Sequence, residues 1–346
     1  MYEKFYIMGD FNELLDVYHI MDSSLLFIGA IGFDNRCIEV LKTITDKIDS
    51  NHSRKQMFLF VYLNNPSDLH YLSATRIQKQ HETTIKKIMA NKNLTYEIVD
   101  TKQFFQNNHF FAHVNIMKKL KQINLNEFKN IIIDTSSMPR AIILYILDYV
   151  LNHTHDYINV FVTYAYYKTL GSFHPQIEIY EPIIIGNESE VMDKIILIPI
   201  LGYNYNMLEA IIRKYHNRII DIYPVVGLPS IKPLESDNIV KYNRKLFIEY
   251  GVPFSNVIYG SMYNPFILYM KLSKLVNNIR NIGNFDIVTA PLGTKPQAVA
   301  TGILKYIDKI NIVYTPPRSY PIITYDHVSK ILFYWIKGEV YINEEV

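Results

Sequence analysis

The sequence predicts an α/β protein made of two tandem Rossmann-like domains, with mostly parallel sheets, helices on both faces of each sheet and an internal pseudo-duplication. Short apolar runs alternate with longer segments whose apolar residues have helical spacing, and this plan returns in the second half of the chain. Strands that are apolar on both faces and separated by helices form parallel sheets covered on both sides. A length of 346 residues is also comfortable for two domains.

In the first half, apolar runs alternate regularly with segments of helical period. We expect strands over 25–30, 57–63, 95–99, 130–135 and 158–166. Between them, the spacing predicts helices over 33–48, 72–90, 111–123 and 139–151. Alternating strands and helices of this kind are typical of a Rossmann-like architecture.

The second half repeats several features of the first half in the same order. A strand over 194–203 leads into a helix over 205–215, much as 25–33 leads into 35–44. Gly32 and Gly202 are in register, and each is followed by an aromatic residue and then an acid or amide. Segment 285–307 resembles 131–150, and segment 310–317 resembles 158–165. Matched landmarks in one order favour an internal duplication, although any two Rossmann-like domains share part of this pattern.

The polar segment 184–193 is the expected boundary between the two domains. It contains Gly186, Asn187, Glu188 and Ser189, a composition typical of linkers. We therefore expect one Rossmann-like domain over 1–186 and a second over 187–346.

Composition and charge exclude several classes of protein. The chain is 49% hydrophobic and 20% charged with a net charge of +2, which fits a folded protein and argues against a binder of duplex DNA. One cysteine excludes an intramolecular disulfide framework and a thiolate metal cluster. The N-terminus lacks the pattern of a signal peptide, and the apolar runs are shorter than the roughly 20 residues that cross a bilayer. We expect a cytoplasmic protein that does not enter a membrane.

The turn at 134–140 is the first candidate site. Asp134 ends an apolar run, three small hydroxyl residues follow, and Pro139 and Arg140 begin a helical pattern. Ligands of open parallel sheets bind beyond the carboxyl ends of the strands, where a helix N-terminus offers free N–H groups and a positive dipole end. Ser136 and Ser137 would add donors, and Arg140 would add charge and a bidentate fork. The pattern predicts a phosphate site.

An ordinary helix cap is the alternative for this turn. Ser136 or Ser137 would cap the helix, and Asp134 would cap the adjacent turn. The second half carries a matching turn at 291–296, where Gly293, Thr294 and Lys295 again combine small donors with a cation. Two equivalent turns of this composition favour anion binding in both halves of the chain.

Other strand ends supply the remaining candidate residues. The turn 32–36 could bring Asp34 to a ribose hydroxyl and Arg36 to a phosphate; the alternative is a surface cap with a solvated arginine. Arg318, in the Pro-rich segment 314–321, could reach a phosphate while aromatic neighbours stack on a base; the alternative is a rigid loop that packs its tyrosines. The candidate ligand-binding residues are Gly32, Asp34, Arg36, Asp134, Ser136, Ser137, Arg140, Tyr203, Asn204, Gly293, Thr294, Lys295 and Arg318.

No metal site or cofactor is expected from the sequence. The histidines lack metal spacing, because 109-HFFAH-113 has no internal glutamate. Gly29 and Gly32 form only a fragment of a dinucleotide fingerprint. Cys37 follows Arg36 at a helix start, where its thiol pKa could be low, although burial in the helix is the simpler interpretation.

A strand followed by Gly293, Thr294 and Lys295 at a helix start is similar to the signature of CARF-type Rossmann domains. These domains sense cyclic oligonucleotides in prokaryotic immunity. Two such domains in one chain resemble the SAVED arrangement, in which a fused pair imitates a CARF dimer. The first copy departs from the family, because it has Ser-Ser-Met-Pro-Arg over 136–140 where the family has Gly-Gly-Thr-Lys. The resemblance implies a nucleotide sensor in antiviral defence.

Three functional hypotheses follow. The first is a binding module whose matched turns face one another around a nucleotide with several phosphates. The second is an enzyme in the same pocket, such as a ring nuclease, a nucleotide N-glycosidase or a phosphoribosyl-type transferase, with Asp134 as its catalytic residue. The third is a structural subunit, which would need a protein partner or a second copy of the chain. The second turn has Ala290 and Pro291 where a matching acid would stand, which permits one active site but not two.

Overall fold

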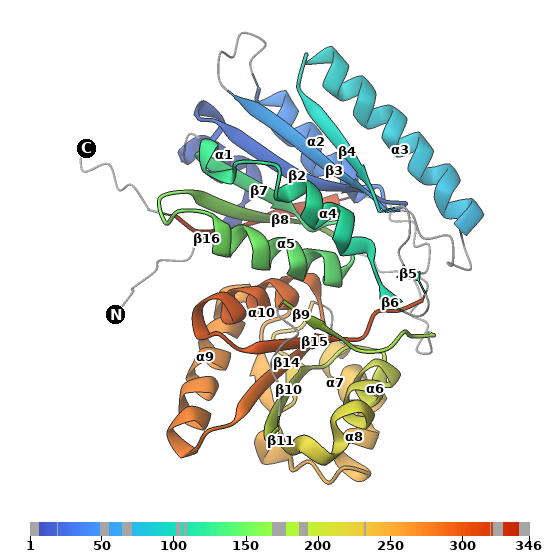
Figure 1. Ribbon diagram of the computed structural model, residues 1–346, viewed down its shortest axis with the longest axis vertical. Coiled ribbons are helices and arrows are strands. Elements are labelled where there is room, and N and C mark those ends of the chain that lie inside the picture. The colour runs from blue at the N-terminus through green and yellow to red at the C-terminus, as the bar shows by residue number, and fades with distance from the viewer. Residues whose placement is uncertain are drawn as a thin grey trace.

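The structure of the protein is a computed structural model that describes residues 7–18, 20–48, 55–63, 71–101, 105–106, 109–167, 178–186, 193–231, 233–318, 320 and 328–338. These residues form an α/β fold with two large, mostly parallel sheets flanked by helices (Figure 1). The predicted fold class is confirmed.

The first sheet has the strand order β1-β16-β8-β7-β2-β3-β4. Its strands are β1 (Ile7–Asp10), β2 (Leu25–Ile31), β3 (Gln56–Tyr62), β4 (Tyr96–Asp100), β7 (Asn130–Asp134), β8 (Asn159–Tyr167) and β16 (Val328–Lys337). The five strands from β8 to β4 are parallel, whereas β16 runs antiparallel to both β8 and β1. Every residue of β2 and β7 is buried, which explains the apolar sequence of β2 and the three isoleucines inside β7.

The second sheet has the order β13-β12-β10-β14-β15-β9, and β11 also pairs with β10. Its strands are β9 (Ile183–Ile185), β10 (Ile195–Ile200), β11 (Ile219–Ile222), β12 (Val225–Gly227), β13 (Ile258–Gly260), β14 (Asp286–Pro291) and β15 (Asn311–Tyr314). Among the described strands of this sheet, β9 alone is antiparallel, and it lies beside β15 at one edge. A further two-stranded sheet joins β5 (Phe105–Gln106) and β6 (His109–Phe110).

The two large sheets share one plan. Starting beside an antiparallel strand, β8-β7-β2-β3-β4 of the first sheet corresponds to β15-β14-β10-β12-β13 of the second. β2 and β10 are therefore the equivalent central strands, as the matched glycine turns predict. The duplicated strand order confirms the predicted pseudo-duplication of the fold.

The residues of the two sheets are not separated at a single point of the chain. β16 comes from the end of the chain but pairs with β8 in the first sheet, and β9 precedes residue 187 but pairs with β15 in the second. The ranges 1–186 and 187–346 therefore do not coincide with the two sheets. The sequence pattern could not reveal this exchange, because strand pairing depends on which edge remains open after the sheets form.

The helices cover the faces of both sheets (Figure 1). They are α1 (Phe11–Val17), α2 (Arg36–Asp46), α3 (Tyr71–Asn91), α4 (Ala112–Leu120), α5 (Arg140–His153), α6 (Tyr205–Tyr215), α7 (Glu235–Tyr242), α8 (Arg244–Ile248), α9 (Pro265–Ile282) and α10 (Lys295–Asp308). Single 3₁₀ turns are η1 (Ile20–Asp22), η2 (Leu125–Glu127), η3 (His216–Arg218) and η4 (Phe254–Asn256). In the described part of the chain, no helix combines the length and apolarity that crossing a membrane requires.

Helices α5 and α10 join the two halves. They lie against each other between the two sheets (Figure 1), and one continuous apolar core includes residues of both helices and both sheets. The approach is close at Gly302, where an added Cβ would lie 2.9 Å from Leu147 Cδ1. Because the two candidate turns lie at the starts of α5 and α10, this packing brings the turns toward each other.

Candidate functional site

The turn after β7 is built around a fully buried carboxylate. Asp134 Oδ1 accepts hydrogen bonds from the Ser136 backbone N–H (3.1 Å), the Ser136 hydroxyl and the Thr163 hydroxyl (3.2 Å). The second oxygen, Oδ2, is buried and has no hydrogen-bond partner among the described residues. A buried polar atom without a partner is rare and costly, so it is a candidate contact for a ligand.

The hydroxyls of this turn do not cap α5. The N-cap residue is Pro139, which makes no side-chain capping bond. Ser136 Oγ instead accepts from the Ala165 N–H at 2.8 Å, and Ser137 Oγ donates to the Ala30 carbonyl at 3.2 Å. The helix-cap alternative therefore holds only for Asp134, which does accept from the turn. Both serines tie the turn to neighbouring strands.

Arg36 forms a buried ion pair with Asp34 at the end of β2. The guanidinium donates to Asp34 Oδ2 through Nε (2.8 Å) and Nη2, and Asp34 Oδ1 accepts from the Arg36 backbone N–H at 3.1 Å. The Arg36 Nη1 group also lies 3.4 Å from both the Tyr164 hydroxyl and the Ala165 carbonyl. Arg36 is only 6% exposed. The solvated surface arginine considered as an alternative is wrong, because this turn folds back against β8.

Lys295 crosses from the second half into the first. Its Nζ donates a hydrogen bond to the main-chain carbonyl of Ser136. Burial lowers the pKa of Lys295 well below its usual value, and the charges of Arg36 and Arg140 lower it further. Asp34 and Asp134 oppose this shift. The structure thus brings five of the predicted residues, from three separate turns, into one charged cluster.

Arg140 contributes the least engaged cation of this cluster. It begins α5 and is partly exposed, and its Nε is shielded from solvent without a hydrogen-bond partner in the described part of the chain. Asp134 faces the same cluster, and burial raises its carboxyl pKa to about 6, although Ser136 and the Lys295 charge act in the opposite direction. A carboxyl with this pKa exchanges protons near neutral pH.

The matching turn of the second half is capped in the ordinary way. Thr294 is the N-cap of α10 and forms a capping box with Gln297. Its hydroxyl also donates to the Met262 carbonyl at 2.5 Å. An added Cβ at Gly293 would lie 2.1 Å from Gln297 Oε1, so it would displace the side chain that accepts the capping hydrogen bond from the Thr294 N–H. Gly293 and Thr294 therefore determine the conformation of the turn. The Lys295 side chain extends from this turn and contacts Ser136 in the first half.

The glycine corners differ in their steric demands. A Cβ at Gly202 would lie 2.1 Å from the Leu292 carbonyl oxygen, so the backbone approach between β10 and β14 needs a glycine there. At Gly32 the nearest neighbours of an added Cβ are 3.5 Å away, which is ordinary contact. The Gly32 carbonyl accepts from His81 Nδ1 at 2.8 Å. The matched glycines are equivalent in position but not in steric role.

A carboxylate that the sequence interpretation missed lies beside Tyr203. Glu235, the first residue of α7, is 4% exposed and hydrogen-bonds with the Tyr203 hydroxyl. Burial first, and then the charge of Glu235, raise the pKa of Tyr203. The Asn204 side chain makes no capping bond for α6, and its Oδ1 is shielded without a partner among the described residues. The signal that the sequence offered for this residue was an acid at the start of a helix, in the segment after β11 and β12.

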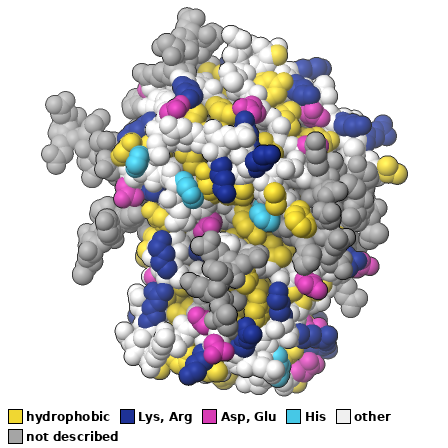
Figure 2. Space-filling model, viewed as in Figure 1, with side chains coloured by type: hydrophobic (Ala, Val, Ile, Leu, Met, Phe, Trp, Pro, Cys, Tyr) yellow, Lys and Arg dark blue, Asp and Glu magenta, His cyan; other side chains and the backbone are white. Residues whose placement is uncertain are grey.

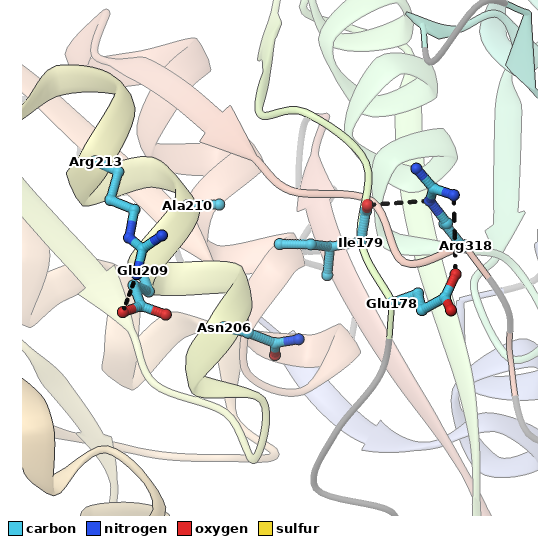
Figure 3. A pocket seen from close by; sticks show the side chains of 7 residues that line it. All are labelled: Glu178, Ile179, Asn206, Glu209, Ala210, Arg213 and Arg318. Atoms are coloured by element: carbon cyan, nitrogen blue, oxygen red, sulfur yellow. Dashed lines mark hydrogen bonds and ion pairs between the residues drawn. The ribbon is translucent and has the colours of Figure 1, made fainter.

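Arg318 lies at a different cavity (Figure 3). Its Nε donates to the Ile179 carbonyl at 3.3 Å, and its guanidinium lies 3.8 Å from the Glu178 carboxylate. The cavity has a volume of about 530 Å³ and is lined by Glu178, Ile179, Asn206, Glu209, Ala210, Arg213 and Arg318. Glu209 and Arg213, from α6, pair with each other on the opposite side (Figure 3). The ring of Tyr180, which was not among the predicted aromatic residues, lies under the Arg318 guanidinium, with its centroid 5.0 Å from Cζ.

The remaining sequence features have structural explanations. Cys37 is buried, and burial together with the charge of Asp34 raises the pKa of its thiol, so the low thiol pKa considered from the sequence is wrong. The described residues contain no group of three or more potential metal ligands. Two of the histidines, His52 and His70, lie outside the described residues. On the face shown in Figure 2, Lys and Arg side chains are interspersed with Asp and Glu.

Comparisons with known proteins identify no family for this chain. No protein-family model matches the sequence, and no curated protein matches it significantly. A solved structure that is similar is the crystal structure of a functionally unknown protein from Pseudomonas aeruginosa, with 9% sequence identity and a TM-score of 0.26. That match covers 86% of this chain and 94% of the other. The class that the structure itself defines is a pair of Rossmann-like α/β units with duplicated strand order.

Proposed function

We propose that the protein binds a nucleotide with more than one phosphate where the two matched turns meet, and that it acts as a sensor or regulatory protein. The observation that carries the proposal is the contact of Lys295 with the turn of the first half. Through this contact, cations from both halves lie within electrostatic range of one another.

The charges of the cluster favour an anionic ligand. Arg36 and Arg140 supply two permanent cations, and Asp34 and Asp134 supply two carboxyls. Lys295, whose pKa is lowered by burial and by the two arginines, would become fully charged when an anion binds beside it. Asp34 is already paired with Arg36, and the raised pKa of Asp134 reduces its negative charge near neutral pH. Confined cations without matching anions are costly, and phosphate groups would relieve that cost. The start of α5 adds backbone N–H groups and the positive end of its dipole.

Binding at this place would connect a ligand with the arrangement of the two halves. Lys295 would exchange its bond to the Ser136 carbonyl for a phosphate oxygen, and the same phosphate would reach Arg140. A ligand that prefers one arrangement of the halves shifts the population toward it. Such a response suits a sensor, and the resemblance to CARF and SAVED domains makes cyclic oligonucleotides the first ligands to test, with a role in antiviral defence.

Mass spectrometry of small molecules released from the denatured protein tests this proposal directly. We expect a phosphorylated nucleotide in the eluate, or submicromolar to micromolar binding of added cyclic oligonucleotides or nucleoside diphosphates by calorimetry. Lys295→Met should weaken that binding, whereas Arg213→Met, which removes a surface arginine paired with Glu209, should not. Binding that is equally strong in the Lys295 variant would contradict the proposed place of the ligand.

An enzyme acting on the same ligand is the second candidate. Its specific support is Asp134, whose pKa is raised to about 6 and whose Oδ2 has no partner among the described residues. Such a carboxyl suits a general base or acid. Chromatography of a cyclic oligonucleotide or dinucleotide incubated with the protein distinguishes the two functions. Turnover that Asp134→Asn abolishes while binding remains would establish the enzyme.

A further inference from the structure

The two oxygens of the Asp134 carboxylate have different surroundings. Oδ1 accepts three hydrogen bonds, from the Ser136 N–H at 3.1 Å, from the Ser136 hydroxyl and from the Thr163 hydroxyl at 3.2 Å. Oδ2 is buried and has no partner in the described part of the chain. A carboxylate oxygen has about two lone-pair sites, so three donors occupy Oδ1 completely. A proton or a further hydrogen bond on this side chain therefore belongs to Oδ2.

The donors to Oδ1 are themselves held in place. Ser136 Oγ accepts from the Ala165 N–H at 2.8 Å. The Thr163 carbonyl accepts from the Thr135 N–H at 3.0 Å and from the Thr135 hydroxyl at 2.7 Å. Asp134 is 0% exposed. The turn and β8 thus fix the orientation of the carboxylate and keep it away from bulk water.

Cations stand beside this carboxylate. Lys295 Nζ donates to the Ser136 carbonyl, so Lys295 and Asp134 both bind to Ser136. Arg140, in the same turn, has a shielded Nε without a partner among the described residues. A phosphate that carries a hydroxyl would satisfy all of these groups. Its ionised oxygens would accept from Arg140 and Lys295, and its hydroxyl would donate to Asp134 Oδ2.

Charged and titratable groups from several elements surround Asp134. They are Asp34 and Arg36 after β2, Cys37 of α2, His81 of α3 beside Cys37, Arg140 of α5, Tyr164 of β8 beside Arg36, and Lys295 of α10. Asp34 is paired with Arg36, and burial raises the thiol pKa of Cys37, so these groups keep their charge near neutral pH. Burial raises the carboxyl pKa of Asp134 to about 6, so Asp134 gains or loses a proton in this range.

We infer that Asp134 is a specificity-determining residue whose Oδ2 accepts a hydrogen bond from a hydroxyl of the bound phosphate, so that the site takes a terminal phosphate in preference to a sulfate or a phosphodiester. This inference rests on the proposed function and deepens it. A terminal phosphate ionises for the second time at about pH 6 and can bring the proton itself. Sulfate and phosphodiesters carry no hydroxyl near neutral pH, so Asp134 must first take up a proton to bind them.

Inorganic phosphate and sulfate are matched probes for this inference. Both are tetrahedral dianions at pH 8, and only phosphate has a hydroxyl. Their affinities would be measured at pH 5 and pH 8 by calorimetry, or by displacement of pyrophosphate where binding is weak. At pH 8 we expect at least tenfold tighter binding of phosphate, because the protonated fraction of a carboxyl falls about tenfold per pH unit above its pKa. At pH 5 the preference should be lost.

Asp134→Asn should remove the preference at pH 8. Because Oδ1 is occupied by three donors, the amide NH₂ would take the place of Oδ2 and act as a permanent donor. We expect sulfate binding at pH 8 to strengthen about tenfold. Asp308→Asn is the matched control, because Asp308 is also buried, accepts from Ser273 through Oδ1 at 3.0 Å and has no partner for Oδ2 among the described residues. Asp308 ends α10, whereas Lys295 begins it, so this variant should keep the preference for phosphate.

Proton uptake gives a second test that needs no variant. Calorimetry at pH 8 in buffers of different ionisation enthalpy measures the protons taken up on binding. Sulfate should take up about one proton more than phosphate, because Asp134 must be protonated for sulfate alone. Lys295 and His81 act on both dianions alike, so the difference between the two anions reports Asp134. This measurement decides the question if Asp134→Asn does not fold.

The outcomes separate this inference from the proposed function. Equal affinities at pH 8, equal proton uptake, or a preference that survives in folded Asp134→Asn would overturn the inference and leave the anion site standing. Absence of binding for phosphate, sulfate, pyrophosphate and every nucleotide would overturn the proposed function, and the inference with it.

Discussion

Lys295 Nζ donates a hydrogen bond to the main-chain carbonyl of Ser136, although the two residues belong to different halves of the chain. Each residue stands in one of two turns that the duplication makes equivalent. The two turns therefore form one site, in which Lys295 of the second half contacts the turn of the first half.

Reversing the charge of Arg140 should weaken ligand binding without unfolding the protein. Unit charges 4 Å apart interact by about 4 kcal/mol at an effective dielectric near 20, and screening reduces this value. For Arg140→Glu we expect a loss of about 1.4 to 3 kcal/mol in binding of a nucleoside diphosphate, which is roughly tenfold to a few hundredfold. A carboxylate at the start of α5 is compatible with the helix dipole, so the melting temperature should change little.

Arg213→Glu is the control for that experiment, because Arg213 is an exposed arginine of α6 that pairs with Glu209. It changes the total charge equally and should leave binding almost unchanged. If Arg140→Glu instead lowers the melting temperature strongly while the folded fraction binds normally, Arg140 is a structural residue.

The pH dependence of stability should contain a contribution from Asp134. Its carboxyl pKa in the folded protein is about 6, above the ordinary value of 3.8, so the folded state holds this proton more tightly than the unfolded state. Stability is therefore highest at low pH for this group and decreases as pH rises from about 4 to 6. The raised pKa corresponds to a decrease of about 3 kcal/mol at most.

Asp134→Asn removes this titration while keeping the shape of the side chain. Urea unfolding at pH 5 and pH 7.5 should show the variant gaining stability relative to wild type at the higher pH. Parallel pH profiles for the two proteins would show that burial does not raise this pKa in solution.

The buried pair of Arg36 and Asp34 should matter for stability. The side chains of Arg36 and Asp34 are 7% and 11% exposed, so removing the arginine leaves a nearly buried carboxylate without its cation. For Arg36→Leu we expect a loss of about 3 kcal/mol or more in the free energy of unfolding. Adding Asp34→Asn should recover part of that loss, because the unpaired charge is then gone. Arg140→Leu is the comparison, and it should cost less than about 1 kcal/mol. Equal losses for both arginines would argue against a special role for the pair.

The two matched glycines should respond differently to alanine. Gly202→Ala places a Cβ 2.1 Å from the Leu292 carbonyl oxygen, and backbone must move to relieve the overlap. We expect a loss of about 2 kcal/mol in the free energy of unfolding, typical of overpacking. Gly32→Ala meets its nearest atoms at 3.5 Å and should be tolerated. Chemical denaturation of both variants gives the comparison, and a Gly32 variant as unstable as the Gly202 variant would contradict it.

The sequence by itself determined the fold class, the equivalent central strands and the turns that carry the candidate residues. Hydrophobic periodicity is a local property, so the buried strands β2, β7, β10 and β14 are visible in it. The equivalence of the two halves was also visible, because Gly32 and Gly202 each follow a central strand and precede an aromatic residue and then an acid or amide.

Only the tertiary structure decided which groups meet. Lys295 reaches Ser136 because α5 and α10 pack against each other, and no local pattern encodes that contact. β16, from far along the chain, lies between β1 and β8 in the first sheet. The raised pKa of Asp134 and the place of Glu235 next to Tyr203 likewise depend on burial by segments distant in the chain. Periodicity fixes which faces of a segment are apolar, whereas partners and desolvation arise from the packing of the whole molecule.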